Sequence, residues 1–131
     1  LNILCEQGDI SLLRFLGSVY RVASSRGVGV HGAIPGIANL VPAAAVRAWE
    51  AGEAGDADAV RRCNAELITA NKIQRLAKGG SANAAIYAGM KSALKMMGIL
   101  DHDTLTRPMR SMTEDEKAQI QPILKDLGLL N

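Results

Sequence analysis

Residues 27–46, GVGVHGAIPGIANLVPAAAV, constrain the fold of this chain more than any other stretch of its sequence. Three of their glycines match the spacing G-x-G-x-x-G of a dinucleotide-binding turn, which must lead directly into a helix. Pro35 and Gly36 stand where the first turn of that helix would be, and a Pro-Gly pair is typical of a turn. The pattern therefore favours a short strand flanked by glycines over a phosphate-binding loop.

The apolar pattern predicts one further strand and five helices. Residues 1–6, which begin with the apolar run LNILC, are typical of a buried strand, and Asp9 is a candidate cap for a helix over residues 10–23. The order strand, helix, strand predicts that residues 1–6 and 30–35 pair in parallel. The other helices are predicted over residues 42–55, 55–80, 81–99 and 113–128.

Several residues are well suited to the ends of these helices. Pro42 fits a first turn, where its missing N–H costs no helical hydrogen bond. Asp56 is placed to cap the second of the four, and Thr113 with Glu116 has the spacing of a capping box. Pro122 lies inside the last helix and should kink or delay it.

Composition narrows the classes of function. The 131 residues carry a net charge of +2, which suits one globular domain without a basic stripe. Aromatic residues make up only 3%, so a nucleic-acid surface is not expected. Cys5 and Cys63 lie far apart, which predicts buried free thiols in place of a zinc or redox motif. The sequence has neither an apolar run of membrane-spanning length nor a secretory signal pattern, so we expect a cytoplasmic location and no membrane partner.

The residues themselves show no catalytic constellation. Asp101, His102 and Asp103 are adjacent, and adjacent side chains rarely converge on one metal ion, so we expect a solvated loop there. His31 is the other histidine and stands beside the predicted strand. Four lysines fall within predicted helices, which leaves no candidate for a desolvated amine at a strand end: Lys72, Lys78, Lys91 and Lys95. We expect neither a metal nor a cofactor.

Three stretches together resemble the C-terminal portion of the dihydrodipicolinate synthase / N-acetylneuraminate lyase family: VHGAIPGIANLVP, AWEAGEAGDADAVRRCNAEL and NAAIYAGMKSALKMMGI. The resemblance covers residues 29–131 and rests on the set of motifs more than on any single one. The positions that match the family's pattern are Gly32, Ile34, Asn39, Pro42, Gly55, Asp56, Ala59, Asn64, Lys91, Ala93, Leu94 and Gly98.

The resemblance implies an α/β fold, a partial (β/α)8 barrel followed by a C-terminal helical extension. Residues 1–54 would be the last two strand–helix units of a truncated barrel, and residues 55–131 a three-helix extension. VHGAIPG would be the eighth barrel strand and LNILCEQGD the seventh. The glycines of the opening stretch would then flank a barrel strand, where close packing and a turn require them.

The family's enzymes form a Schiff base between a lysine and a 2-oxo acid, often pyruvate. The resemblance therefore implies that this chain is the C-terminal segment of such a lyase or aldolase, with Ile34 and Gly8 lining the substrate site. The family's Schiff-base lysine and proton-relaying tyrosine would both precede Leu1, so the chain alone is expected to be inactive. The intact protein would be a homo-oligomer that binds a 2-oxo acid and needs no cofactor.

A second hypothesis comes from another functional class. The chain would be a non-catalytic helical scaffold or assembly module that derives from the same family and has lost its chemistry. Upstream sequence discriminates between the two: a preceding strand that carries G-x-K would support the enzyme, and a start codon near Leu1 would support the scaffold.

Overall fold

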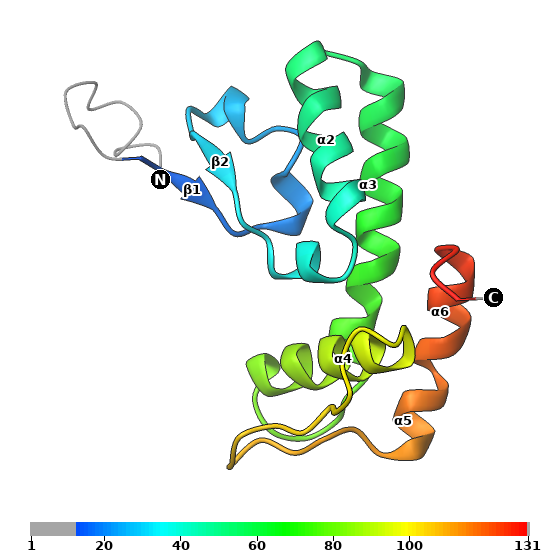
Figure 1. Cartoon of the computed structure of the whole chain (residues 1–131). Helices are drawn as coiled ribbons and strands as arrows, with labels where there is room; N and C mark the ends of the chain where they lie inside the picture. Colours follow the sequence, from blue (N-terminus) through cyan, green and yellow to red (C-terminus); the bar gives the residue numbers. More distant parts are fainter. Residues whose placement is uncertain (1–12, 131) are drawn as a thin grey trace. The chain divides into compact units, whose positions relative to one another are not determined.

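The computed structural model describes residues 13–130, which form an α/β structure of mostly helices and two short parallel strands (Figure 1). By its contacts the chain divides into two compact units, residues 1–67 and residues 68–131. In the first unit, strand β1 (Phe15–Leu16) pairs in parallel with strand β2 (Gly32–Ala33). Phe15 lies opposite Gly32, and Leu16 lies opposite Ala33.

The predicted helix over residues 10–23 is wrong for its described part. Residues 13–23 contain β1 and the short 3-10 helix η1 (Val19–Arg21), because the backbone around β1 bonds to the segment that contains β2 and only the single turn η1 bonds within itself. His31 N–H donates to the Arg14 carbonyl at 2.8 Å, and Ile34 N–H donates to the Leu16 carbonyl at 2.8 Å. The strand predicted at residues 1–6 and the cap predicted at Asp9 lie outside the described residues.

The connection from β1 to β2 contains two 3-10 turns, η1 and η2 (Arg26–Val28). The fully buried Ser25 organises it: its hydroxyl donates to the Arg21 carbonyl at 2.7 Å, and its own carbonyl accepts from Val30 N–H. Gly29 ends η2 with φ +76°, a left-handed conformation that favours glycine. One glycine of the opening stretch is therefore required by a turn.

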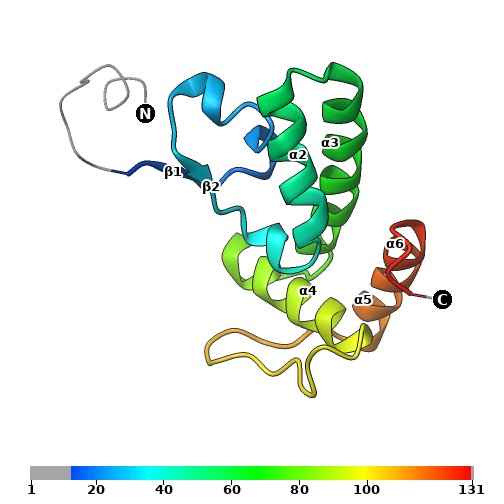
Figure 2. The same ribbon diagram turned by 45° about the horizontal axis from the view of Figure 1, so that its top comes forward.

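Helix α2 (Pro42–Ala54) follows β2 after the 3-10 turn η3 (Gly36–Asn39), and lies beside α3 (Ala57–Asn71) in both views (Figures 1 and 2). Pro42 occupies the first turn as predicted, and Gly55 ends α2 with φ +69°. The face of α2 that is buried consists of small side chains: Ala44, Ala45, Ala48 and Ala51. Small side chains of this kind let neighbouring segments approach the helix closely.

Helix α3 has the predicted cap, but it ends before the predicted position. The Asp56 carboxylate accepts from the N–H groups of Asp58 and Ala59 at 3.1 and 2.9 Å. The α-helix stops at Asn71 and tightens into η4 (Lys72–Arg75), so the residues from Leu76 to Gly80 that were predicted as helix are not helical. Packing decides this end, because η4 is the element with the most extensive contact to α4.

The second unit contains η4 and helices α4 (Ala82–Met96), α5 (Glu114–Ala118) and α6 (Ile120–Asp126). Its core includes Ile73, Ile120 and Leu124, each with no exposed surface. The predicted last helix is broken at Gln119, one turn before Pro122, which confirms the expected effect of that proline.

Candidate functional site

The C-terminal ends of β1 and β2 form the candidate site of the first unit. The two strands are parallel and in register, so the residues that follow them, Gly17 and Ile34, lie at the same C-terminal end of the sheet. We call this end the candidate edge. In open and closed parallel sheets, ligands bind at this edge. Ile34 is held there by the hydrogen bond from its N–H to the Leu16 carbonyl, and its side chain is 68% exposed.

Gly17 was not singled out by the sequence patterns, although it directly follows β1. A side-chain carbon at Gly17 would meet no atom within 4 Å, so the backbone borders open space beside the end of β2. Ser18 comes next in extended conformation, and its hydroxyl does not cap η1. The signal that could have found this position is the pair Phe15–Leu16 followed by glycine, an apolar pair too short for a strand pattern.

The predicted site residue Gly8 lies outside the described residues, so its role stays a prediction. The strand that pairs with β2 in the described part of the chain is β1, and the glycine at its C-terminal end is Gly17. The role of Ile34 also stays a prediction. The structure shows that this residue directly follows β2 at the candidate edge.

Two side chains fix the pairing of the strands. The Phe15 ring covers Gly32, where an added side-chain carbon would stand 2.7 Å from the ring, so the glycine makes room for the aromatic side chain. His31 accepts a hydrogen bond from Arg14 N–H through its Nδ1 at 3.1 Å, so the histidine side chain helps to hold β2 beside β1. No α-helix begins directly after Gly32; the next one starts at Pro42, which does not fit a dinucleotide-binding turn.

A groove of about 430 Å³ opens between β2 and α2. Its walls are mainly apolar and include Ala33, Pro35, Ala45, Val46 and Trp49. We call it the β2–α2 groove.

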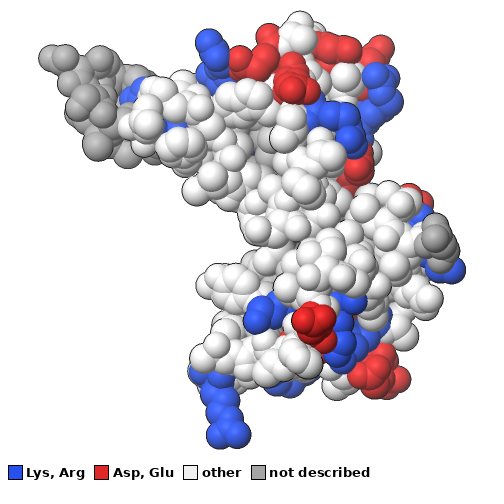
Figure 3. All heavy atoms as spheres, viewed as in Figure 1, with Lys and Arg blue, Asp and Glu red and all other residues white. Residues whose placement is uncertain are grey.

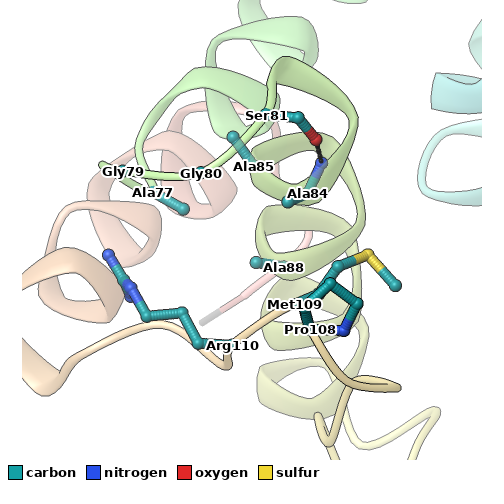
Figure 4. Close-up of a pocket in the computed structure, with 10 residues that line it drawn as sticks. All are labelled: Ala77, Gly79, Gly80, Ser81, Ala84, Ala85, Ala88, Pro108, Met109 and Arg110. Atoms are coloured by element: carbon teal, nitrogen blue, oxygen red, sulfur yellow. Dashed lines mark hydrogen bonds between the residues drawn. The ribbon is translucent and has the colours of Figure 1, made fainter.

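The second unit has a pocket of about 480 Å³, lined by the residues that Figure 4 labels. Gly79, Gly80 and Ser81 lead into α4 on one side, and Arg110 extends toward them from the other (Figure 4). Ser81 caps α4 by accepting from Ala84 N–H at 3.2 Å. The Arg110 guanidinium is engaged by the Lys78 carbonyl and by the Glu116 carboxylate.

Glu116 is the centre of this arrangement. Its carboxylate accepts from Arg110 at 2.7 and 2.8 Å, from Lys78 N–H at 2.7 Å and from Thr113 N–H at 2.9 Å. The Arg110 guanidinium, and then the two backbone N–H groups, hold the pKa of Glu116 far below its usual range, although burial acts in the opposite direction. The capping box with Thr113 is confirmed, and Glu116 additionally fixes the loop around Lys78.

The expectation that Asp101, His102 and Asp103 form a solvated loop is wrong for Asp103, whose side chain is buried. Its side chain is only 10% exposed and lies 3.0 Å from Lys117 Nζ and 3.3 Å from Lys95 Nζ, and it accepts from the Ser92 hydroxyl at 3.1 Å. Burial alone would raise the pKa of Asp103, but the hydrogen bonds from Lys117, Lys95 and Ser92 outweigh it and lower the pKa to about 2. The described residues contain no group of three or more acidic, histidine or cysteine side chains able to hold a metal ion.

The lysines lie away from the strand ends in the sequence. Lys72 is the first lysine of the chain, so the segments that follow β1 and β2 contain none. Lys91 and Lys95 are helical as predicted, and they donate to the Thr104 carbonyl and to Asp103. The prediction that Lys78 lies in a helix is wrong, because this residue lies in the loop before α4. The buried thiol predicted for Cys63 is confirmed.

The described surface carries charges of both signs. On the face that Figure 3 shows, basic and acidic side chains lie side by side over α2 and α3, and the surface around β2 is largely uncharged. Among the helices of residues 13–130, none combines the length and apolar character needed to cross a membrane.

Comparisons with known proteins relate this structure to one family. The model of the dihydrodipicolinate synthetase family matches residues 4–127. An uncharacterised DapA-like lyase, found in two strains of Halobacterium salinarum, is 34% identical over 119 residues, which are 90% of this chain and 36% of that protein. The solved dihydrodipicolinate synthase of the commensal bacterium Bacteroides thetaiotaomicron is similar with a TM-score of 0.78 and 26% identity, over 87% of this chain and 37% of that one. The chain spans little more than a third of the length of these relatives.

Proposed function

The chain belongs to the dihydrodipicolinate synthetase family, and from that premise we propose that it is the C-terminal segment of a lyase or aldolase that forms a Schiff base with pyruvate or a similar 2-oxo acid. The observation that carries the proposal is the parallel pair β1 and β2 within a chain that matches 37% of a dihydrodipicolinate synthase. In this proposal β1 and β2 are the last two strands of a (β/α)8 barrel, and the helices from α3 onward form its extension.

The proposed chemistry needs an amine that this chain does not place at a strand end. A neutral lysine attacks the keto carbon of the substrate, water leaves, and the resulting iminium accepts the electron pair when a carbon–carbon bond breaks or forms. Desolvation or a cationic neighbour must keep that amine unprotonated. We place this lysine in the preceding part of the barrel, outside the chain.

The contribution of this chain would be part of the wall of the substrate site. Ile34 offers an apolar side chain at the end of β2, and Gly17 leaves room beside it at the end of β1. An apolar wall excludes water from the amine, which lowers the pKa of a lysine by disfavouring its charged form. The proposal includes a homo-oligomeric, cytoplasmic enzyme that binds no cofactor.

A chimera tests this proposal. The N-terminal portion of the Bacteroides synthase, up to the region that matches this chain, is fused to the full 131-residue chain and incubated with pyruvate and borohydride. We expect a stable adduct on a lysine of the N-terminal portion, and none on the 131-residue chain alone or on the N-terminal portion alone. A folded chimera that traps no pyruvate would contradict the enzyme and favour the non-catalytic scaffold.

A further inference from the structure

Another cavity lies between α2 and α3, which run side by side in opposite directions (Figures 1 and 2). It has a volume of about 550 Å³ and is lined by residues of α2, of α3 and of the turn that joins them. We call it the α2–α3 pocket. Its lining residues begin at Arg47, past the first turn of α2, so the pocket is separate from the candidate edge.

One face of each helix forms the pocket. Both helices contribute positions spaced i, i+3, i+4 and i+7, which share a face; the series begins at Arg47 on α2 and at Ala59 on α3. Because the two helices are antiparallel, Arg47 faces Glu66, and their side chains form an ion pair at 2.8 Å. One turn further along both helices, Glu50 and Arg62 lie on facing walls.

Glu50 and Arg62 carry opposite charges but do not pair with each other. Among residues 13–130 neither side chain has an ion-pair or hydrogen-bond partner, and both are exposed. Ala51 and Ala54 beside them are small and leave the space open. Cys63 is buried, and a free thiol of this kind behaves as a small apolar group. The pocket therefore offers one anion, one cation and an apolar floor.

A free α-amino acid matches these three features. At neutral pH it is a zwitterion whose ammonium group suits the Glu50 carboxylate. Its carboxylate suits the Arg62 guanidinium, which can donate two parallel hydrogen bonds. An apolar side chain would cover Ala51 and Cys63. We infer that the α2–α3 pocket binds a free α-amino acid with an apolar side chain between Glu50 and Arg62.

The inference goes beyond the proposed function and does not depend on it. A 2-oxo acid such as pyruvate has no ammonium group, and its carboxylate would be repelled by Glu50 and Glu66 at the pocket. The pocket volume falls within the range of about 300–1,000 Å³ that is usual for small-molecule sites. The ligand of this pocket is therefore distinct from the proposed substrate.

The test measures binding to the full 131-residue chain by isothermal titration calorimetry, with L-valine as the probe. Isovalerate is the matched compound without the amino group, and isobutylamine is the matched compound without the carboxylate. We expect one L-valine to bind per chain. Each analogue loses one charged contact and should bind at least about fivefold more weakly, a factor that corresponds to about 1 kcal/mol.

Two pairs of variants locate the site. Glu50→Gln and Arg62→Gln each remove one charge from the pocket and should weaken L-valine binding at least about fivefold. Glu53→Gln and Arg61→Gln remove the same charges from the same two helices at positions that do not line the pocket, and should leave the Kd within about twofold. All four side chains are exposed, and circular dichroism confirms that the variants remain folded.

Cys63 gives a second readout. The chain has two cysteines, so Cys5→Ser leaves Cys63 as its one thiol. L-valine should slow the alkylation of Cys63 by N-ethylmaleimide, because the bound side chain covers the thiol at the pocket floor. Isobutylamine at the same concentration should protect the thiol less.

Four results would overturn the inference. L-valine could give neither binding heat nor protection of Cys63, or isovalerate could bind as tightly as L-valine, which would mean that no ammonium group is recognised. Arg61→Gln could weaken binding as much as Arg62→Gln, which would make the effect one of overall charge. Pyruvate could displace L-valine from the chimera, which would place the amino acid in the proposed substrate site.

Discussion

Gly52 of α2 lies directly against the backbone of Ala23, so that a side-chain carbon at position 52 would overlap the Ala23 carbonyl. A glycine inside a helix costs stability relative to alanine, yet here it allows α2 to approach the β1–β2 connection closely. We predict that Gly52→Ala lowers the free energy of unfolding by about 1–3 kcal/mol, the usual cost of overpacking. Urea denaturation followed by circular dichroism measures the change.

Gly27→Ala is the matched control for this prediction. A side-chain carbon at Gly27 would meet nothing within 4 Å, and its φ is not in the left-handed region. The free energy of unfolding of Gly27→Ala should therefore stay the same or rise slightly, because alanine reduces the entropy of the unfolded chain. Equal stability of Gly52→Ala and Gly27→Ala would mean that the close approach of α2 is not required.

Local signals in the sequence correctly predicted the starts of helices α2, α3 and α5. Pro42, Asp56 and the pair Thr113 and Glu116 act through groups at most three residues away, so their effect depends little on the rest of the fold. The break before Pro122 is local in the same way, because the missing N–H affects the preceding turn.

The parts that could not be predicted depend on distant partners. Strand β1 has two residues, and its flanks carry apolar side chains at helical spacing, so only the pairing with β2 reveals it. Asp103 is buried because Lys95 and Lys117 come from two different helices to meet it. The sequence predicted Ile34 as a site residue but not Gly17, because Gly17 joins the candidate edge only through the pairing of β1 with β2.

Acid should destabilise the second unit in a defined pH window. The pKa of Asp103 is depressed in the folded protein, from 3.8 to about 2, so its ionised form favours folding. This contribution is fully present above the ordinary pKa and is lost as pH falls from about 4 toward 2. The pKa of Glu116 is depressed as well, and its contribution is lost in the same direction.

We predict that the urea midpoint falls steeply as pH drops from about 4 toward 2 and that Asp103→Asn makes this fall shallower. Asp103→Asn should also be less stable at neutral pH, by about 1–3 kcal/mol, because it leaves buried hydrogen-bonding groups without their charged partner. Asp126→Asn, at an exposed carboxylate of α6, is the control and should keep the wild-type pH profile. A profile of Asp103→Asn identical to the wild type would contradict the role of Asp103.

Glu116 should matter more than the helix cap that it completes. Thr113→Ala removes one capping interaction, which typically costs about 1 kcal/mol. Glu116→Gln weakens the capping box and also the contacts with Arg110 and Lys78 N–H, so it should lower the melting temperature more than Thr113→Ala does. Hydrogen exchange at Lys78 N–H separates the two: it should accelerate in Glu116→Gln and stay slow in Thr113→Ala. Equal exchange in both variants would show that Glu116 acts as a cap alone.

The final prediction concerns the candidate edge in the assembled site. Gly17 borders open space and its φ is not in the left-handed region, so Gly17→Val should leave the stability of this chain unchanged. In the chimera with the Bacteroides N-terminal portion, the added carbons would occupy the space beside Ile34 where the proposed 2-oxo acid lies. We expect the rate of pyruvate trapping to fall at least tenfold, a loss of about 1.4 kcal/mol in binding or barrier. Gly27→Val adds the same carbons at another open position of the same connection and should trap pyruvate like the parent chimera.

Ile34→Ala should lower the rate of pyruvate trapping as well, because it removes part of the apolar wall. Ile34 is 68% exposed in this chain and hence contributes little to its stability. If Gly17→Val and Gly27→Val trap pyruvate equally fast, the ends of β1 and β2 do not line the substrate site.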